Sequence, residues 1–316
     1  MRIGVLTSGG DAPGMNAAIR AVVRRALYAG AAVVGIHRGY AGLMTGELTP
    51  LDVSSVADIV HRGGTMLLTA RSAAFMTPEG LAVATSQAAP LDGLVAIGGD
   101  GTLRGAAALE GAGVRTAVVP ATIDNDVPCT ERSIGFDTAV NTVVQAVDRI
   151  RDTATAHERI FVVEVMGRHR GFIALAAGVA VGAESILVPE EPVDLDAICE
   201  RLERGYARGK RHSIIIAAEG AASGFAIADA IQARTGHEAR TTVLGHVQRG
   251  GSPTAADRIL AARLGEAAVA HLLAGGRGAM MGLAGVEVAA VPYADVMRSE
   301  WPLDRRLYET AAVLAI

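Results

Sequence analysis

The chain has 316 residues, 50% of them hydrophobic, and a formal net charge of -4, which suits one large or two ordinary globular domains. No apolar stretch is long enough to span a bilayer and the first residues lack a secretion signal, so we expect a cytoplasmic protein with no membrane partner. Slight acidity and few aromatic residues argue against nucleic acid as a partner. Cys129 and Cys199 lie far apart and without metal-ligand spacing, so we expect neither a disulfide nor a zinc site.

Short apolar runs typical of buried strands alternate with helical patterns along the chain. The predicted strands cover residues 3–7, 31–36, 94–97, 117–119, 160–165 and 213–218, and the predicted helices cover residues 16–29, 103–110, 138–153, 172–180 and 225–234. This alternation predicts an α/β fold with mostly parallel sheets and helices on both faces. The length fits two interlocked lobes, and the spacing alone does not locate the passages between them.

A glycine-rich turn, TSGGDAPGMN at residues 7–16, joins the first predicted strand to the first predicted helix. Backbone amides at Gly9 and Gly10 can approach phosphate oxygens because glycine has no Cβ, and the helix dipole attracts an anion. The turn has neither the Walker pattern nor the spaced glycines of dinucleotide folds. By itself it supports a phosphate site and a tight structural turn equally.

The motif GGDGT at residues 98–102 also follows a predicted strand directly. Asp100 offers a hard oxygen ligand suited to Mg²⁺, and the flanking glycines allow a polyphosphate to lie close to the backbone. The same motif occurs in NAD kinases and lipid kinases, so it indicates a nucleotide phosphate without naming the acceptor. The less favoured alternative is that Asp100 only caps the helix at Thr102.

Two carboxylates and a hydroxyl gather in PATIDND at residues 120–126, after the predicted strand at 117–119. Asp124 and Asp126 would then lie in the crevice beyond the carboxyl edge of a parallel sheet, where a base could take a proton from a hydroxyl. Read without its context, this stretch favours a plainer alternative, in which Asp124, Asn125 and Asp126 are turn residues that cap the next helix.

Two further motifs carry basic residues. MGRHRG at residues 166–171 ends a predicted strand, and Arg168 could place its guanidinium fork on phosphoryl oxygens. In HVQRGGSP at residues 246–253, His246 and Arg249 lie three apart before two glycines, which suits a phosphomonoester. A lone histidine is more often structural, so His246 gains weight only together with Arg249.

These five motifs, in this order and at these intervals, closely resemble those of the 6-phosphofructokinase family, and the likeness extends over nearly the whole chain, including Arg71, Glu219, Arg240 and PLD at 302–304. The resemblance implies a phosphofructokinase-like fold of two Rossmann-like three-layer α/β/α lobes. It implies a nucleotide-binding lobe of residues 1–135 plus 247–297 and a sugar-phosphate-binding lobe of residues 136–246 plus 298–316. It further implies phosphorylation of fructose 6-phosphate at the 1-hydroxyl by MgATP, the committed step of glycolysis.

The resemblance also implies a role for each matched residue. Asp124 would be the general base, accepting the proton late because a carboxylate with an ordinary pKa of about 4 is too weak to ionise an alcohol beforehand. Asp100 would organise Mg²⁺, with Asp126 as a second candidate. The catalytic residues implied are Gly10, Thr122, Asp124 and Arg168. The nucleotide-binding residues implied are Gly10, Arg71, Ser72, Gly98, Gly99, Asp100, Gly101 and Thr102. The sugar-phosphate-binding residues implied are Thr122, Ile123, Asp124, Arg159, Met166, Gly167, Arg168, Glu219, Arg240, His246, Val247, Gln248 and Arg249.

Family members present arginines like Arg159 and Arg240 from a neighbouring subunit, so we expect a homotetramer with active sites shared between chains. ATP users in the family resemble this chain in having Gly at position 101, whereas pyrophosphate users carry Asp there and Lys in place of Ala121. The resemblance therefore favours ATP as donor, with pyrophosphate as the alternative. Val53 and Ser54 stand where bacterial members have an effector-binding arginine and tyrosine, so we expect weak or altered effector control.

Other basic residues resemble those that bind effectors in bacterial members; they are Arg20, Arg24, Arg151 and the segment at residues 210–212. The sequence leaves two rival functions to consider. A kinase for another acceptor would share GGDGT, but this function does not explain the HVQRGG and MGR motifs. An inactive sensor of sugar phosphates would not need Asp100 and Asp124 together.

Overall fold

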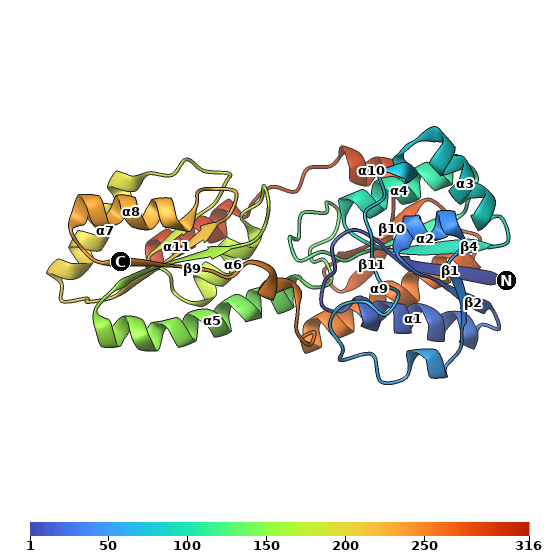
Figure 1. Cartoon of the computed structure of the whole chain (residues 1–316), viewed down its shortest axis with the longest axis horizontal. Coiled ribbons are helices and arrows are strands. Elements are labelled where there is room, and N and C mark those ends of the chain that lie inside the picture. The colour runs from blue at the N-terminus through green and yellow to red at the C-terminus, as the bar shows by residue number, and fades with distance from the viewer. Residues whose placement is uncertain (316) are drawn as a thin grey trace. The chain divides into compact units, whose positions relative to one another are not determined.

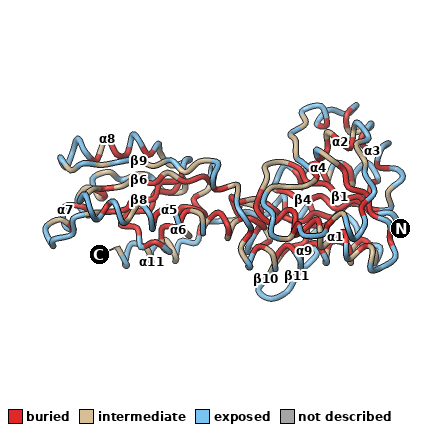
Figure 2. The backbone as a smooth tube through the Cα atoms, turned by 60° about the horizontal axis from the view of Figure 1, so that its bottom comes forward, coloured by how far each residue is buried: buried red, intermediate tan, exposed pale blue. Residues whose placement is uncertain are grey.

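The computed structural model describes residues 1–315 and divides into two compact units (Figure 1). Unit 1 comprises Met1–Thr138 and Arg249–Trp301, and unit 2 comprises Ala139–Gln248 and Pro302–Ile316. Each unit has a sheet between two layers of helices, so the predicted α/β fold with mostly parallel sheets is confirmed. Figure 2 shows that the sheet strands form the buried centre of each unit.

The sheet of unit 1 has seven strands in the order β11-β10-β5-β4-β1-β2-β3. Their bounds are β1 (Arg2–Thr7), β2 (Ala32–Ile36), β3 (Leu48–Leu51), β4 (Gly93–Gly98), β5 (Thr116–Pro120), β10 (Ala279–Ala284) and β11 (Glu287–Pro292). The inner strands are parallel, and the two edge strands, β3 and β11, are antiparallel to their neighbours. All residues of β4 and β5 are buried, as expected for central parallel strands covered on both faces.

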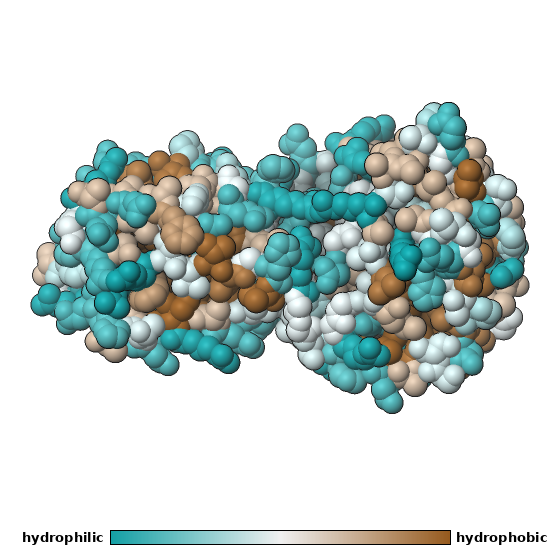
Figure 3. Space-filling model, viewed as in Figure 1, coloured by the Kyte–Doolittle hydropathy of each residue, from teal (hydrophilic) through white to brown (hydrophobic). Residues whose placement is uncertain are grey.

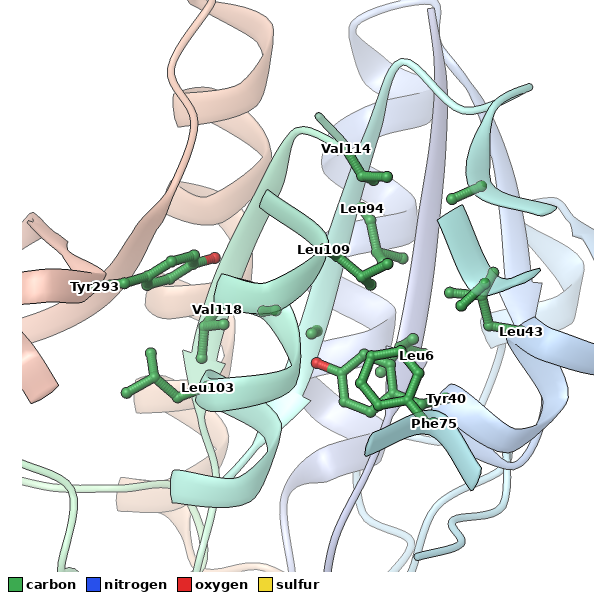
Figure 4. Packing of buried hydrophobic residues seen from close by; sticks show 14 of the residues in the cluster. Leu6, Tyr40, Leu43, Phe75, Leu94, Leu103, Leu109, Val114, Val118 and Tyr293 are labelled. Atoms are coloured by element: carbon green, nitrogen blue, oxygen red, sulfur yellow. The ribbon is translucent and has the colours of Figure 1, made fainter. Parts of the chain in front are cut away.

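Helices cover both faces of this sheet. One face carries α1 (Met15–Tyr28) and α9 (Ala255–Leu273), which pack against each other, and the other carries α2 (Gly39–Thr45), α3 (Pro78–Ala88), α4 (Asp100–Gly111) and α10 (Tyr293–Arg298). In the second layer the rings of Tyr40 and Phe75 stack with centroids 4.3 Å apart (Figure 4). The Tyr40 hydroxyl donates to the carbonyl of Thr102 at 2.6 Å, which ties this core to the GGDGT segment.

Unit 2 has a four-stranded parallel sheet in the order β7-β8-β6-β9. Its strands are β6 (Ile160–Val165), β7 (Ser185–Leu187), β8 (Ser213–Ala218) and β9 (Ala239–Val243). The helices α7 (Leu195–Ala207) and α8 (Gly224–Thr235) pack on one face through apolar residues such as Ile198 and Ile231. The remaining helices are α5 (Phe136–His157), α6 (Phe172–Ala180) and α11 (Arg305–Leu314), and α6 packs against α11.

Several elements were not predicted from the sequence, although all the predicted strands and helices are present. They include the hairpin of β10 and β11, the edge strand β3 and the helices α2, α3, α7, α9, α10 and α11. Cys129 and Cys199 are both free thiols. Among the described residues, none of the helices combines the length and apolar character needed to cross a bilayer.

Candidate active site

Three of the predicted loops meet at one edge of the unit 1 sheet. β1, β4 and β5 are adjacent parallel strands, so the segments that follow them leave the sheet at the same carboxyl edge. The register pairs Thr7 with Ile97 and Gly98 with Pro120, which brings the three strand ends level. The topology therefore gathers TSGGDAPGMN, GGDGT and PATIDND at the place where open α/β sheets bind ligands.

Direct hydrogen bonds join these loops. The Thr102 hydroxyl donates to the carbonyl of Ser8 at 3.0 Å, and the Ala121 amide donates to the carbonyl of Gly98 at 2.9 Å. Gly98 is required sterically, because a Cβ there would lie 2.2 Å from the Thr102 hydroxyl oxygen and 2.4 Å from the Ser8 carbonyl oxygen. The GGDGT turn is thus fixed to both neighbouring loops.

Gly10 in the first loop lies against the guanidinium of Arg249. A Cβ on Gly10 would stand 2.6 Å from Nη1 of Arg249, and this nitrogen donates to the Asp11 carbonyl at 3.3 Å. Gly9 has φ of 84°, a conformation that glycine adopts without strain. The loop is therefore held open by glycines and carries an arginine charge beside its backbone amides.

The PATIDND segment does not cap a helix, because the next helix, α5, begins only at Phe136. Asp124 is 2% exposed, and its amide donates to the Thr122 hydroxyl at 3.2 Å. Asn125 adopts a left-handed φ of 52°, and its side-chain oxygen accepts the Ser133 amide at 2.8 Å. Ser133 in turn donates its hydroxyl to the Thr122 carbonyl at 2.7 Å, so this loop is braced from within.

Asp100 lies in the first turn of α4, where Gly99 is the capping residue and makes no side-chain capping bond. The helix-capping alternative for Asp100 is therefore wrong. Its carboxylate accepts Nε of Arg104 at 2.9 Å and is half exposed. The described residues contain no group of three or more His, Cys, Asp or Glu able to hold a metal on their own. One exposed carboxylate fits Mg²⁺, which binds through one or two carboxylates plus substrate phosphates.

Arg71 and Ser72 lie on a segment that is tied to the first loop. The hydroxyl of Thr69 donates to the Gly9 carbonyl at 2.7 Å, which brings this segment to the same edge of the sheet. The Arg71 side chain is exposed and available to an anion. The Ser72 hydroxyl accepts the Phe75 amide at 3.1 Å and so begins the short 3₁₀ helix at Ala74–Met76.

The predicted residues of unit 2 gather at the carboxyl edge of its own sheet. Met166, Gly167 and Arg168 follow β6, and Glu219 follows the adjacent parallel strand β8. The Glu219 side chain accepts the Arg168 amide at 2.9 Å, and the Glu219 amide donates to the Val165 carbonyl at 2.8 Å. Gly167 and Arg168 both have positive φ, 139° and 53°. The carboxylate of Glu219 therefore stabilises an unusual turn that presents Arg168.

The HVQR segment forms a short 3₁₀ helix at Gly245–Arg249. Gln248 is fully buried; its side-chain oxygen accepts the Met166 amide at 3.3 Å and its amide nitrogen donates to the Gly245 carbonyl at 3.0 Å. His246 and Val247 are exposed. Gln248 thus joins the HVQR and MGR segments, while the exposed side chains remain available to a ligand.

Arg159 and Arg240 converge on a single carboxylate at the edge strand of the unit 2 sheet. Nε of Arg159 lies 2.8 Å from Glu238, and Arg240 also pairs with Glu238. The Arg159 and Arg240 guanidiniums lower the pKa of the Glu238 carboxyl, Arg159 through the stronger hydrogen bond. Two positive charges against one negative charge leave a net positive patch suited to a phosphate.

Sequence reasoning missed the residues that support these loops, above all Asn125, Ser133 and the buried carboxylate of Asp257. The sequence predicts Asn125 only as a turn residue. A signal for Asp257 does exist, because Thr254 caps α9 and accepts the Asp257 amide, which is the pattern of a helix start. That pattern would have located Asp257 without revealing its partners elsewhere in the chain.

Glycine-rich turns and aspartates at the carboxyl edge of a parallel sheet define an α/β protein built to handle phosphate groups. The family model described as Phosphofructokinase matches residues 2–272, and the chain belongs to this family. The resemblance seen in the motifs is therefore confirmed.

Relatives match over the full length. The chain is 58% identical to ATP-dependent 6-phosphofructokinase 1 of Thermus thermophilus over 320 residues, covering 100% of this chain and 99% of the relative. It is 52% identical to ATP-dependent 6-phosphofructokinase of Bacillus subtilis over 317 residues, covering 100% of this chain and 99% of that one.

Solved structures share the fold. Phosphofructokinase from Saccharomyces cerevisiae matches with a TM-score of 0.89 and 34% identity over 100% of this chain, which spans 48% of the yeast chain. A pyrophosphate-dependent phosphofructokinase from Marinobacter aquaeolei matches with a TM-score of 0.87 and 22% identity, covering 97% of this chain and 86% of that one. At this lower identity the likeness concerns the fold alone.

Proposed function

We propose that the protein transfers the γ-phosphoryl group of ATP to the 1-hydroxyl of fructose 6-phosphate, giving fructose 1,6-bisphosphate and ADP. One observation carries the proposal. The loops that bear Gly10, Asp100 and Asp124 converge at one sheet edge, in a chain 58% identical over its full length to a relative named for this activity.

Asp124 acts as the general base. As the sugar oxygen bonds to the γ-phosphorus, the bond from that phosphorus to the bridging oxygen breaks, and ADP leaves with the electron pair. The hydroxyl proton passes to the Asp124 carboxylate late in this step, because a carboxylate is too weak to ionise an alcohol beforehand. Burial at 2% exposure and the braced loop hold the carboxylate in one position. Positioning and charge stabilisation therefore provide most of the rate enhancement.

Several groups can stabilise the negative charge of the phosphates. The amide of Gly10 and the guanidinium of Arg249 beside it can stabilise the transferring phosphoryl group, while Arg71 and the Gly98–Thr102 turn cradle the nucleotide phosphates. Mg²⁺ would be held by Asp100, with Asp126 as a second candidate, and would supply charge neutralisation on the nucleotide phosphates. By family resemblance, Arg168 also stabilises the oxygens of the transferring phosphoryl group.

The surroundings of Gly101 and Ala121 support ATP over pyrophosphate as the donor. A Cβ added to Gly101 would meet nothing within 4 Å, so the face of the turn above Gly101 is open to a nucleotide. Ala121 is fully buried in a bridge with Ile134, where a lysine side chain would have to be desolvated. Neither position carries the side chain that pyrophosphate users in the family tend to have.

Unit 2 supplies the sugar-phosphate contacts. The backbone at Met166 and Gly167, the side chains of Arg168 and Glu219 and the exposed His246 offer donors and acceptors to the sugar hydroxyls and the 6-phosphate. By family resemblance, Arg249 is also a sugar-phosphate contact. Thr122 and Ile123 lie in the loop of the base and would contact the reacting end of the sugar.

We assign Arg159 and Arg240 to the 6-phosphate of a neighbouring subunit, in a homotetramer. Their net positive patch lies beside the edge strand β9, whose Val243 is 46% exposed, and Phe225 of α8 is 61% exposed. Figure 3 shows apolar side chains that remain at the surface of the single chain. An edge strand with exposed apolar neighbours is suited to a subunit interface. ATP and sugar phosphates are cytoplasmic metabolites, so we propose that the enzyme is cytoplasmic.

Effector control is proposed to be weak or altered. Val53 is 55% exposed and offers no charge, and the Ser54 hydroxyl already donates to the Asp52 carboxylate at 2.6 Å. Arg151 and Lys210 are engaged with the Val181 carbonyl and Glu184, respectively. Millimolar ADP or phosphoenolpyruvate is expected to leave the half-saturating fructose 6-phosphate concentration nearly unchanged, and a strong shift would contradict this.

A matrix of initial rates tests the main proposal. MgATP or magnesium pyrophosphate is combined with fructose 6-phosphate, fructose or no acceptor, and ADP or phosphate release is measured. Turnover is expected only with ATP and fructose 6-phosphate together. A faster rate with pyrophosphate would refute ATP as donor, and binding of fructose 6-phosphate without turnover would favour the sensor.

A further inference from the structure

The proposed mechanism assigns no role to one buried carboxylate outside the predicted site. Asp257, in the first turn of α9, is 1% exposed. A buried carboxylate is costly unless hydrogen bonds satisfy it, so its partners indicate what it stabilises.

Both carboxylate oxygens accept hydrogen bonds from a segment more than a hundred residues earlier in the chain. Oδ1 accepts the Gly135 amide at 2.9 Å, and Oδ2 accepts the Thr138 amide at 2.8 Å and the Thr138 hydroxyl. The same hydroxyl oxygen accepts the Thr254 amide at 3.0 Å. Asp257 thereby clamps the start of α5 to the start of α9.

Gly135 is the last residue of the loop that carries Asp124. Just before it, Ile134 pairs with Ala121 in a β-bridge, and its amide donates to the Pro120 carbonyl at 3.1 Å. The loop therefore leaves the sheet at Pro120 and returns beside it at Ile134, with its far end fixed by Asp257. If that end moves, the position of the Asp124 carboxylate moves with it.

The glycine-rich loop at residues 7–16 packs against the same end of the Asp124 loop, at Ile134 and Gly135. A Cβ on Gly135, which has φ of 104°, would lie 2.7 Å from Cβ of Ala12. A Cβ on Gly14 would lie 2.5 Å from the Ile134 side chain and 3.6 Å from Cβ of Asp257. No space separates the clamp from the phosphate-binding loop, so a displacement at Asp257 reaches both loops.

We propose that Asp257 is a positioning residue of the phosphoryl-transfer site, which sets the placement of the Asp124 loop relative to the Gly10 loop. This inference rests on the proposed function, because it concerns the geometry of that reaction. Asp257 touches neither substrate in the proposal and acts only through Gly135 and Thr138. Small misplacements of reacting groups lower the reaction rate strongly. When ground-state binding is preserved, this loss appears in kcat and not in KM.

The principal variant is Asp257→Asn, which keeps the volume and one acceptor oxygen. We expect kcat to fall about 10- to 100-fold, the range for sub-ångström to ångström misplacement, with KM for ATP and fructose 6-phosphate changed less than about threefold. Thr138→Val removes one donor to the carboxylate and should lower kcat in the same manner. Thr138→Ser retains the hydroxyl and should preserve kcat.

Glu110→Gln is the matched control. Glu110 also accepts a backbone amide and a threonine hydroxyl, both from Thr116, but at the opposite, amino end of β5. It should lower the melting temperature without changing kcat. Equal kcat for Asp257→Asn and wild type, or equal kcat losses in Asp257→Asn and Glu110→Gln, would overturn the proposal.

Hydrogen exchange of the peptide covering residues 121–138 provides a readout independent of turnover. Asp257→Asn should speed exchange there, and Glu110→Gln should not. A wild-type protein that makes no ADP from fructose 6-phosphate refutes the proposed function. An active wild type with unchanged kcat and exchange in Asp257→Asn refutes only the positioning role.

Discussion

The carboxylate of Asp100 and the guanidinium of Arg104 form an ion pair across one turn of α4, with Nε 3.1 Å and 2.9 Å from the two carboxylate oxygens. The partner of the proposed magnesium ligand is therefore a side chain of the same helix. The proximity of Asp100 also raises the pKa of Arg104, so the guanidinium stays charged. A divalent cation that binds Asp100 competes with this arginine for the carboxylate charge.

Arg104→Gln should strengthen cation binding. An exposed ion pair contributes about 0.2–1 kcal/mol, so we expect a dissociation constant for Mn²⁺ in the presence of ADP that is lower by a factor of about 1.4 to 5. Electron paramagnetic resonance of free Mn²⁺ measures this without turnover. Arg298→Gln, which breaks the comparable surface pair with Asp295, is the control and should change nothing. Weaker binding in Arg104→Gln would mean that the arginine assists the cation.

Asp124→Asn should abolish most turnover while sparing binding. Loss of a general base costs about 10²- to 10⁴-fold, and here it should appear in kcat. Fructose 6-phosphate affinity, measured by calorimetry, should stay within a few-fold of wild type. Asp126→Asn separates the two carboxylates, since a metal role predicts a raised Mn²⁺ dissociation constant instead. An Asp124→Asn enzyme with ordinary kcat would remove Asp124 from the chemistry.

Gly101→Asp should oppose ATP binding without unfolding the protein. Its Cβ would enter open space, and an aspartate in the first turn of a helix is favourable for the fold. Repulsion between its carboxylate and the nucleotide phosphates should raise KM for ATP roughly tenfold or more. Gly98→Ala is the contrasting variant, because its Cβ would collide with Ser8 and Thr102, and it should lower the melting temperature. An unchanged KM for ATP in Gly101→Asp would show that the nucleotide does not pass over this face.

Stability should depend on pH through Asp257. Burial raises the pKa of its carboxyl despite bonds from Thr138 and Gly135, and the charge of Asp137 adds to the increase. A raised pKa means that the folded state holds the proton more tightly than the unfolded state. The contribution of Asp257 is therefore greatest below its ordinary pKa of about 4 and is lost as pH rises through the raised value.

Thermal unfolding of wild type and Asp257→Asn between pH 4 and 7 tests this. The melting temperature of the variant minus that of wild type should increase with pH and then level off. A difference that decreases over this range would mean that the folded protein favours the ionised carboxylate.

Arg240→Ala should weaken sugar-phosphate use. By removing a charge from the pair that surrounds Glu238, it should raise KM for fructose 6-phosphate about tenfold, the usual scale for a charged hydrogen bond to a phosphate. Arg234→Ala breaks the ion pair with Asp196 and should have no such effect.

A dilution series tests the proposed tetramer. Mass photometry measures the size of the assembly at each concentration, and turnover should be lost at the concentrations where the tetramer dissociates. A fully active monomer would exclude sites shared between chains.

Local pattern was enough to predict the strands β1, β2, β4, β5, β6 and β8 and the helices α1, α4, α5, α6 and α8, but not the short parallel strands β7 and β9. Runs such as the one in β4 are apolar throughout because both faces are covered, and glycines mark their ends. The hairpin of β10 and β11 was not predicted. Strand β11 has no fully buried residue, so its apolar pattern resembles a surface helix as much as a strand.

The loops were located because motifs directly follow strands, and parallel order then places strand ends together. What supports these loops could not be read from the chain, since the Asp257 carboxylate meets Gly135 and Thr138 across more than a hundred residues. Gln248 illustrates the same limit. Its place in HVQR implies a substrate contact by family resemblance, but no local pattern indicates that its side chain also bonds to the Met166 amide and the Gly245 carbonyl.

The bonds from Thr102 to Ser8 and from Ala121 to Gly98 make the three phosphate-edge loops one mechanical element. Both acceptors are backbone carbonyls, so a chimera that imports a single loop from a pyrophosphate-using relative keeps these bonds only if the new loop holds its backbone in the same position. Transplanting all three loops together should therefore exchange donor preference more completely than transplanting any one of them.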